Sequence, residues 1–197
     1  DQRWVHSDTL GYITPYGDQK DKHPLIISQA TIGHEHFVQL LTRWIASKAS
    51  NSGLNHAFRF TSISINIGYA AKIHRDSNNL GPSLAIAGGQ YKGGELCTWP
   101  RDNMQQPLTD FGIDQATQHN TYHQAVLFNG KQAHSVLPFE GHRWSLVFFT
   151  ASGALQIDDA TRQAAAQQLH IPIPDRKTMR FTTNATFNII KERALKI

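Results

Sequence analysis

Hydrophobic and polar positions follow two different periods along the chain, and the change of period predicts its elements. Over residues 33–50, apolar side chains recur every three or four positions, which is the spacing of one helix face. Over residues 60–74, Ile63, Ile65 and Ile67 alternate with polar side chains, as in a half-buried strand. The pattern therefore predicts an amphipathic helix followed by strands.

Shorter apolar runs, separated by glycine and polar turns, predict the remaining elements. Segments 84–91 and 94–99 are parted by Lys92 and Gly93, a pairing typical of a hairpin. The other expected elements are strands over residues 124–130, 134–139 and 143–151 and helices over residues 158–169 and 185–195.

The order of these elements indicates the fold class. Helices stand at both ends of a run of short strands, and no repeat or linker divides the chain. With 197 residues, 40% of them hydrophobic, the chain is long enough for one well-buried domain. We expect a single domain over residues 1–197, mainly β with flanking helices, in which a β-sandwich or jelly roll forms the core at about residues 59–151.

Composition and charge set the expected surroundings. Cys97 is the single cysteine, which fits a reducing compartment. No apolar run approaches the ~20 residues of a membrane span, and the first residues lack the features of a signal peptide. We therefore expect an intracellular protein, in the nucleus if the source is eukaryotic and otherwise in the cytoplasm, with no membrane partner and no obligate protein partner. The net charge of +4 is compatible with a phosphate-bearing substrate, although many proteins without one share it.

His74, Asp76 and His134 form the first constellation with chemical meaning. On an extended backbone, residues two apart share a face, so the side chains of His74 and Asp76 point together. His134 begins another predicted strand. Two histidines and one carboxylate leave open positions on a metal, as in the facial triad of non-haem iron(II) oxygenases. The alternative is a strand that carries an unrelated histidine and aspartate on its surface.

Arg143 and Ser145 form the second constellation, within the most apolar predicted strand. A charged arginine is costly there unless an anion pairs with it. Its planar fork fits a carboxylate, and Ser145 on the same face adds a hydroxyl donor. The pair is therefore a candidate anchor for a dicarboxylate. The alternative is a structural ion pair, for example with Glu140 or Asp110.

These motifs together resemble the iron(II)- and 2-oxoglutarate-dependent dioxygenase superfamily. The stretches HRDSNN (residues 74–79) and RWSLVFF (residues 143–149) are similar to motifs of the ten-eleven translocation (TET) and base-J-binding-protein class. The resemblance covers about residues 59–151. It implies a double-stranded β-helix, that is, a jelly roll core.

The resemblance also implies a set of cofactors and the residues that hold them. His74, Asp76 and His134 become the ligands of Fe(II), and Arg143 and Ser145 the residues that bind 2-oxoglutarate, with O₂ as the second co-substrate. The protein is then an oxidoreductase of the dioxygenase type.

For the substrate, the resemblance implies DNA. Members of this class oxidise the 5-methyl group of 5-methylcytosine or thymine on a flipped-out base. Asn79 becomes a candidate to bind the base edge and Phe149 a candidate to stack on the base. Phe149 lacks the hydroxyl of the class's tyrosine, and Ala151 stands where the class has a histidine. Two alternatives stay open: a hydroxylase of a protein or amino-acid side chain, and a non-catalytic jelly roll that binds sugars or nucleic acid.

Other suggestive residues have simpler interpretations. The glycine-rich stretch 88–94 lies between predicted strands and does not open a helix, so we expect a hairpin and not a phosphate-binding loop. His34 and His36 are too close in sequence to share a helix face. We expect His142 to point away from the site and Cys97 to be a small buried residue.

Overall fold

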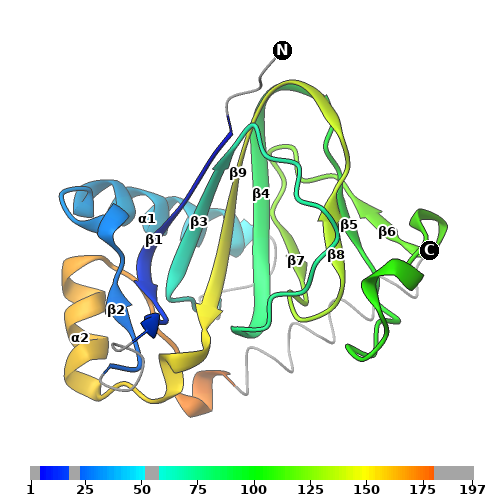
Figure 1. Cartoon of the computed structure of the whole chain (residues 1–197). Coiled ribbons are helices and arrows are strands. Elements are labelled where there is room, and N and C mark those ends of the chain that lie inside the picture. The colour runs from blue at the N-terminus through cyan, green and yellow to red at the C-terminus, as the bar shows by residue number, and fades with distance from the viewer. Residues whose placement is uncertain (1–4, 18–22, 52–57, 180–197) are drawn as a thin grey trace.

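The computed structural model describes residues 5–17, 23–51 and 58–179. In this part of the chain the protein is mainly β, with two antiparallel sheets and flanking helices (Figure 1). This confirms the coarse fold class expected from the sequence. Within the same residues, no helix is long and apolar enough to cross a membrane.

Each strand belongs to one of the two sheets. The larger sheet has the order β2 (Ile26–Ile27), β1 (His6–Ile13), β3 (Ser62–Ile67), β9 (Phe139–Ala151), β4 (Asn79–Gly93) and β7 (Val126–Phe128). The smaller sheet has the order β6 (Thr117–His119), β5 (Leu96–Thr98) and β8 (His134–Val136). The longer α-helices are α1 (Glu35–Asn51) and α2 (Asp159–Gln168), and residues 176–179 are also α-helical. Short 3-10 helices cover Gln29–Thr31, Leu108–Asp110, Ile113–Gln115 and Ser152–Leu155.

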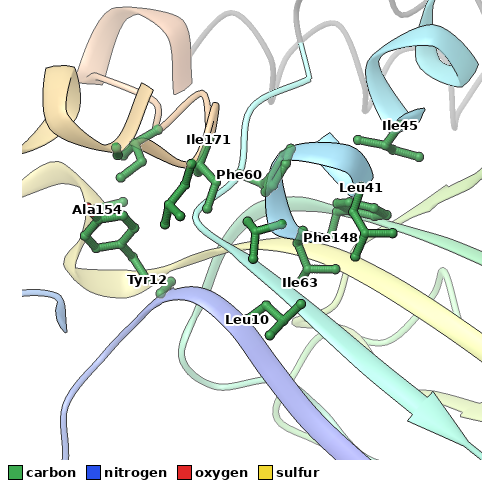
Figure 2. Close-up of a cluster of buried hydrophobic side chains, with 14 of the residues drawn as sticks. Leu10, Tyr12, Leu41, Ile45, Phe60, Ile63, Phe148, Ala154 and Ile171 are labelled. Atoms are coloured by element: carbon green, nitrogen blue, oxygen red, sulfur yellow. The ribbon is translucent and has the colours of Figure 1, made fainter. Parts of the chain in front are cut away.

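One face of the larger sheet carries the main hydrophobic core. Helices α1 and α2 lie on this side of the sheet, away from the smaller sheet (Figure 1). Ile63 of β3 and Phe148 of β9 are fully buried (Figure 2). The rings of Phe148 and Phe60 pack edge to face, with 5.2 Å between their centres. Val38 and Ile45 of α1 belong to the same cluster. Burial of such side chains is worth about 1.5–3 kcal/mol each, so this face anchors the fold.

The opposite face of the same strands is more polar and borders a pocket. Ser64 and Asn66 of β3 line this pocket, whereas Ile63 between polar neighbours faces the core. In register, Asn66 lies opposite Ser145 of β9. The alternation seen in the sequence therefore separates a packing face from a pocket face.

The pairing of β4 differs from the sequence prediction. Segments 84–91 and 94–99 do not form a hairpin, because β4 continues to Gly93 and pairs with β9, whereas β5 pairs with β6 and β8. Gly88 leaves room for the ring of Trp144, its partner on β9, because a Cβ at this position would collide with the ring. The glycines that suggested a turn therefore serve strand packing.

The boundaries of several other elements also differ. The strand expected over residues 60–74 ends at Ile67, and His74 takes part only in an isolated bridge with His134. The helices expected over residues 33–50 and 158–169 are confirmed as α1 and α2. The strands β1, β2 and β6 were not predicted from the sequence pattern, and the helix expected over residues 185–195 lies outside the described residues.

Candidate metal centre

His74, Asp76 and His134 form a compact group that can hold a metal ion. One potential ligand atom from each lies within 4.8 Å of the others. Nε2 of His74 is 3.6 Å from Oδ1 of Asp76, and Nε2 of His134 is 3.7 Å from Oδ2 of Asp76. Three side chains from two distant parts of the sequence thus converge on one point.

The backbone explains this convergence. His74 and His134 exchange two backbone hydrogen bonds, each with an N···O distance of 3.0 Å. The backbone N–H of Asp76 donates to the carbonyl oxygen of Gly130 at 2.8 Å. The segment with the first two ligands is therefore fastened directly to the segment that carries the third.

Both imidazole rings are oriented with Nε2 free for a ligand bond. Nδ1 of His74 lies 2.8 Å from the carbonyl oxygen of Lys72, and Nδ1 of His134 lies 2.8 Å from that of Gln132. A carbonyl oxygen only accepts hydrogen bonds, so Nδ1 carries the proton in each ring. The lone pair of the neutral ring is then on Nε2, which faces Asp76, as metal-binding histidines require.

The charge state of His134 also suits a metal ligand. Its side chain is buried, and burial lowers the pKa of the ring, although the negative charge of Asp76 acts in the opposite direction. The ring is therefore neutral at pH 7. A metal binds neutral imidazole, so no proton has to be displaced from His134.

Asn79 holds the carboxylate of the group. Its side-chain N–H donates to Oδ2 of Asp76 at 2.9 Å, and Asn79 is only 7% exposed. Gly130 leaves the room that this arrangement needs, because a Cβ there would lie 2.9 Å from Oδ2 of Asp76. The structure thus gives Asn79 a position from which it orients a candidate ligand, while its contact with a substrate base stays a prediction.

A pocket of about 280 Å³ contains the metal group. Its lining also includes Arg143, Ser145 and Phe149, which come from β9 on the larger sheet, as the alternation along this strand predicted. Both constellations therefore open into one cavity. Ala151, two residues beyond Phe149 on β9, lies in the hydrophobic core and not in the pocket lining.

Arg143 is buried without an ion-pair partner among the described residues. It is 4% exposed, and its Nε has no hydrogen-bond partner. Neither Glu140 nor Asp110 forms an ion pair with it. Its guanidinium carbon lies 5.4 Å from the centre of the Tyr91 ring and 5.6 Å from that of Phe139. The structural ion pair considered from the sequence is therefore not formed.

The electrostatics of Arg143 reflect this isolation. Burial lowers the pKa of the guanidinium, and the neighbouring Tyr91 and Glu95 only partly oppose the effect. An arginine nevertheless keeps its charge at pH 7. A buried positive charge beside an open pocket favours an anion in that pocket.

Several residues at or next to the site carry no signal in the sequence pattern. Asp102 binds Arg75, the residue between the first two candidate ligands, through two hydrogen bonds of 2.7 Å. Thr121 is buried, lines the pocket and has an Oγ1 without a hydrogen-bond partner. No motif marks either residue, because each reaches the site from a distant loop. The strand β1, which the sequence analysis also missed, adds Ser7 and Thr9 to the pocket wall.

Among the described residues, no other histidine lines this pocket. His34 and His36 are exposed at the start of α1, and His142 is exposed on β9. His119 lies in β6, where Nε2 is 2.9 Å from Oγ1 of Thr98, and His123 is exposed in the following loop. The candidate metal group thus uses two of the eleven histidines of the chain.

Comparisons with known proteins do not assign the chain to a family. A scan against protein-family models finds no match, and a search of curated proteins finds none either. The function therefore has to be inferred from the geometry of the site.

Proposed function

We propose that the protein is an iron(II)- and 2-oxoglutarate-dependent dioxygenase. One observation carries the proposal: a single pocket contains both a two-histidine, one-carboxylate group and a buried arginine without an anionic partner. The first feature suits a metal with open positions, and the second suits a carboxylate. A ligand that chelates a metal and carries a second carboxylate satisfies both.

The donor set fits iron(II). His74 and His134 offer their Nε2 atoms and Asp76 offers a carboxylate oxygen, which is the ligand set of non-haem iron(II) oxygenases. Zinc sites that use thiolates are a poor match, because Cys97 is fully buried and does not belong to the group.

Each residue then has a defined task. When bound, iron(II) and 2-oxoglutarate supply the oxidising chemistry, in which one atom of O₂ enters succinate as CO₂ is lost and the other enters a substrate C–H bond. His74, Asp76 and His134 would hold the metal. Arg143 and Ser145 would bind the far carboxylate of 2-oxoglutarate, and Asn79 donates a hydrogen bond that keeps the Asp76 carboxylate in place.

For the fold, we infer that the two sheets are the halves of a double-stranded β-helix. Two features support this architecture. Both sheets are antiparallel, and the pocket is lined from both of them, with His134 and Leu96 from the smaller sheet and Arg143 and Ser145 from the larger sheet. A jelly roll places its site between two such sheets.

For the substrate, we propose a 5-methylated pyrimidine in DNA, either 5-methylcytosine or thymine. Phe149 on the pocket wall offers an aromatic face on which a flipped base can stack. Ser64 and Asn66 offer neutral hydrogen-bonding groups on the same wall, and the net charge of +4 favours a polyanion. Asn79, the proposed reader of the base edge, lines the pocket too.

Turnover of 2-oxoglutarate tests the metal site. With Fe(II), ascorbate and O₂, the wild-type protein should form succinate, and Asp76→Ala should reduce the rate to background because the metal loses its carboxylate ligand. Asp114→Ala, at an exposed aspartate that does not line the pocket, is the matched control and should retain wild-type turnover. Wild-type rates for purified Asp76→Ala would refute the site.

Mass spectrometry of nucleosides tests the substrate. DNA incubated with the protein, Fe(II) and 2-oxoglutarate should yield a 5-hydroxymethyl pyrimidine, and DNA incubated with Asp76→Ala should not. Succinate formation coupled to peptides, with no oxidised base, would replace the DNA proposal with a hydroxylase of protein side chains. Absence of turnover and of bound iron would instead favour a non-catalytic jelly roll.

A further inference from the structure

Arg75 and Asp102 form an ion pair next to the metal group, and neither residue lines the pocket. Asp102 is 3% exposed and accepts four hydrogen bonds: from Nε and Nη2 of Arg75, from the Met104 N–H and from the Ala133 N–H. Arg75 also donates to the carbonyl oxygen of Gln106 at 2.8 Å. The carboxylate is thus fully satisfied, although it lies in a loop with no metal ligand of its own.

The four hydrogen bonds connect both ligand-bearing segments. Arg75 stands between His74 and Asp76, so its guanidinium holds the first segment. The Ala133 N–H directly precedes His134, and it reaches Oδ2 of Asp102 at 2.6 Å. One carboxylate therefore fixes residues adjacent to all three candidate ligands.

Gln132 adds a second connection to the same loop. Its side-chain N–H group donates to the carbonyl oxygens of Pro100 at 2.9 Å and Asp102 at 3.0 Å. Its own carbonyl oxygen accepts from Nδ1 of His134. The orientation of the His134 ring thus depends on Gln132. The loop around Asp102 holds this residue through its side chain and also through the backbone N–H of the next residue, Ala133.

We propose that Asp102 and Arg75 are positioning residues that preset the geometry of the metal site. The inference rests on the proposed function, because it requires a metal at His74, Asp76 and His134. Ligand positions must be held to within a fraction of an ångström for tight binding, and groups behind the ligands commonly change metal affinity by about 10-fold to 100-fold.

Two variants and one control test this role. Asp102→Asn keeps the shape and removes the charge, and Arg75→Lys keeps the charge and removes the two-pronged contact. Arg162→Lys is the control, because Arg162 also binds backbone oxygens, those of Ala154 and Ile157, but lies on α2 away from the pocket lining. Each purified protein is titrated with Co²⁺, whose visible absorption reports both the affinity and the ligand geometry, and its folding is checked by circular dichroism.

We expect Asp102→Asn and Arg75→Lys to weaken Co²⁺ binding by about 10-fold or more and to alter the absorption spectrum. Arg162→Lys should lose stability and keep the wild-type affinity and spectrum. Folded variants with wild-type affinity and spectrum would overturn the positioning role alone. If Asp102→Asn does not fold, Arg75→Lys decides the question. Absence of Co²⁺ binding by the wild-type protein would overturn the proposed metal site, and the positioning role with it.

Discussion

Arg75 and Arg143 are both largely buried near the candidate metal group, yet their surroundings are opposite. The side chain of Arg75 is 20% exposed and makes two hydrogen bonds of 2.7 Å with Asp102, a carboxylate of the same chain. Arg143 is 4% exposed, leaves Nε without a partner and lies between the aromatic rings of Tyr91 and Phe139. One arginine has its anion built into the fold, and the other faces a pocket.

The presence or absence of an anionic partner distinguishes an arginine that stabilises the fold from one that is available to bind a ligand. Removing an ion from water costs several kcal/mol, which a structural pair recovers through its partner. Arg75 follows that rule. Arg143 does not, so the fold carries an uncompensated charge that an anionic ligand can stabilise. Substitution of Arg143 should accordingly weaken 2-oxoglutarate binding without destabilising the fold, whereas substitution of Arg75 should destabilise the fold.

Arg143→Met should give the largest effect. Without the guanidinium, the far carboxylate of 2-oxoglutarate loses its charged hydrogen bonds, and we expect the KM for 2-oxoglutarate to rise by at least about 100-fold, equivalent to about 3 kcal/mol. Folding should not suffer, because a buried charge without a partner is replaced by an apolar side chain. Steady-state kinetics and urea unfolding measure the two effects.

Arg143→Lys is the control for this substitution. It keeps the charge but not the planar fork, and should fall between wild type and Arg143→Met in KM. A large loss of stability in Arg143→Met, with little change in KM, would mean that Arg143 is structural after all.

Arg75→Met should give the reverse result in an unfolding experiment. Asp102 would lose its positively charged partner while staying buried, so the free energy of unfolding should fall. Urea unfolding of the metal-free protein measures this loss without a contribution from bound metal. Stability equal to that of the wild type would show that Arg75 does not stabilise the buried Asp102 carboxylate. It would contradict the proposed difference between Arg75 and Arg143.

A smaller effect should appear in acid. Burial raises the pKa of Asp102, but the hydrogen bonds from Arg75, Met104 and Ala133 outweigh it and hold the pKa below its ordinary value of 3.8. A carboxyl with a lowered folded-state pKa stabilises the fold above its unfolded-state pKa, and this stabilisation is lost as the pH falls through the folded-state pKa. The stability advantage of wild type over Asp102→Asn should therefore be constant near neutral pH and shrink below about pH 4. An advantage that does not change with pH would contradict this assignment.

The residues of the site differ in how well the sequence predicts their positions. The alternation of β9 predicted that Arg143 and Ser145 share a face, because this follows from local strand geometry. His74 and Asp76 also lie together, but the strand expected there ends at Ile67, and hydrogen bonds to the segment that carries His134 bring them together. Asp102 could not be found in this way. Its contact with Arg75 spans 27 residues and depends on the path of a loop.

The pairing of strands was also beyond the sequence pattern. Gly88 lies in a stretch that resembled a turn, but it serves the packing of Trp144 across two long strands. β1 has no strong alternation, and its pairing with β3 places Thr9 in the pocket wall. Local signals therefore located the candidate chemistry, while the surrounding support depended on contacts distant in sequence.

The most direct test is calorimetric titration of 2-oxoglutarate into the wild-type protein without oxygen, once with Fe(II) and once without metal. If the metal group and Arg143 hold opposite ends of one molecule, binding should be saturable at one site with Fe(II) and at least about 10-fold weaker without it. Absence of binding in the presence of Fe(II), or equal affinity with and without the metal, would contradict the proposal that the two features form one co-substrate site.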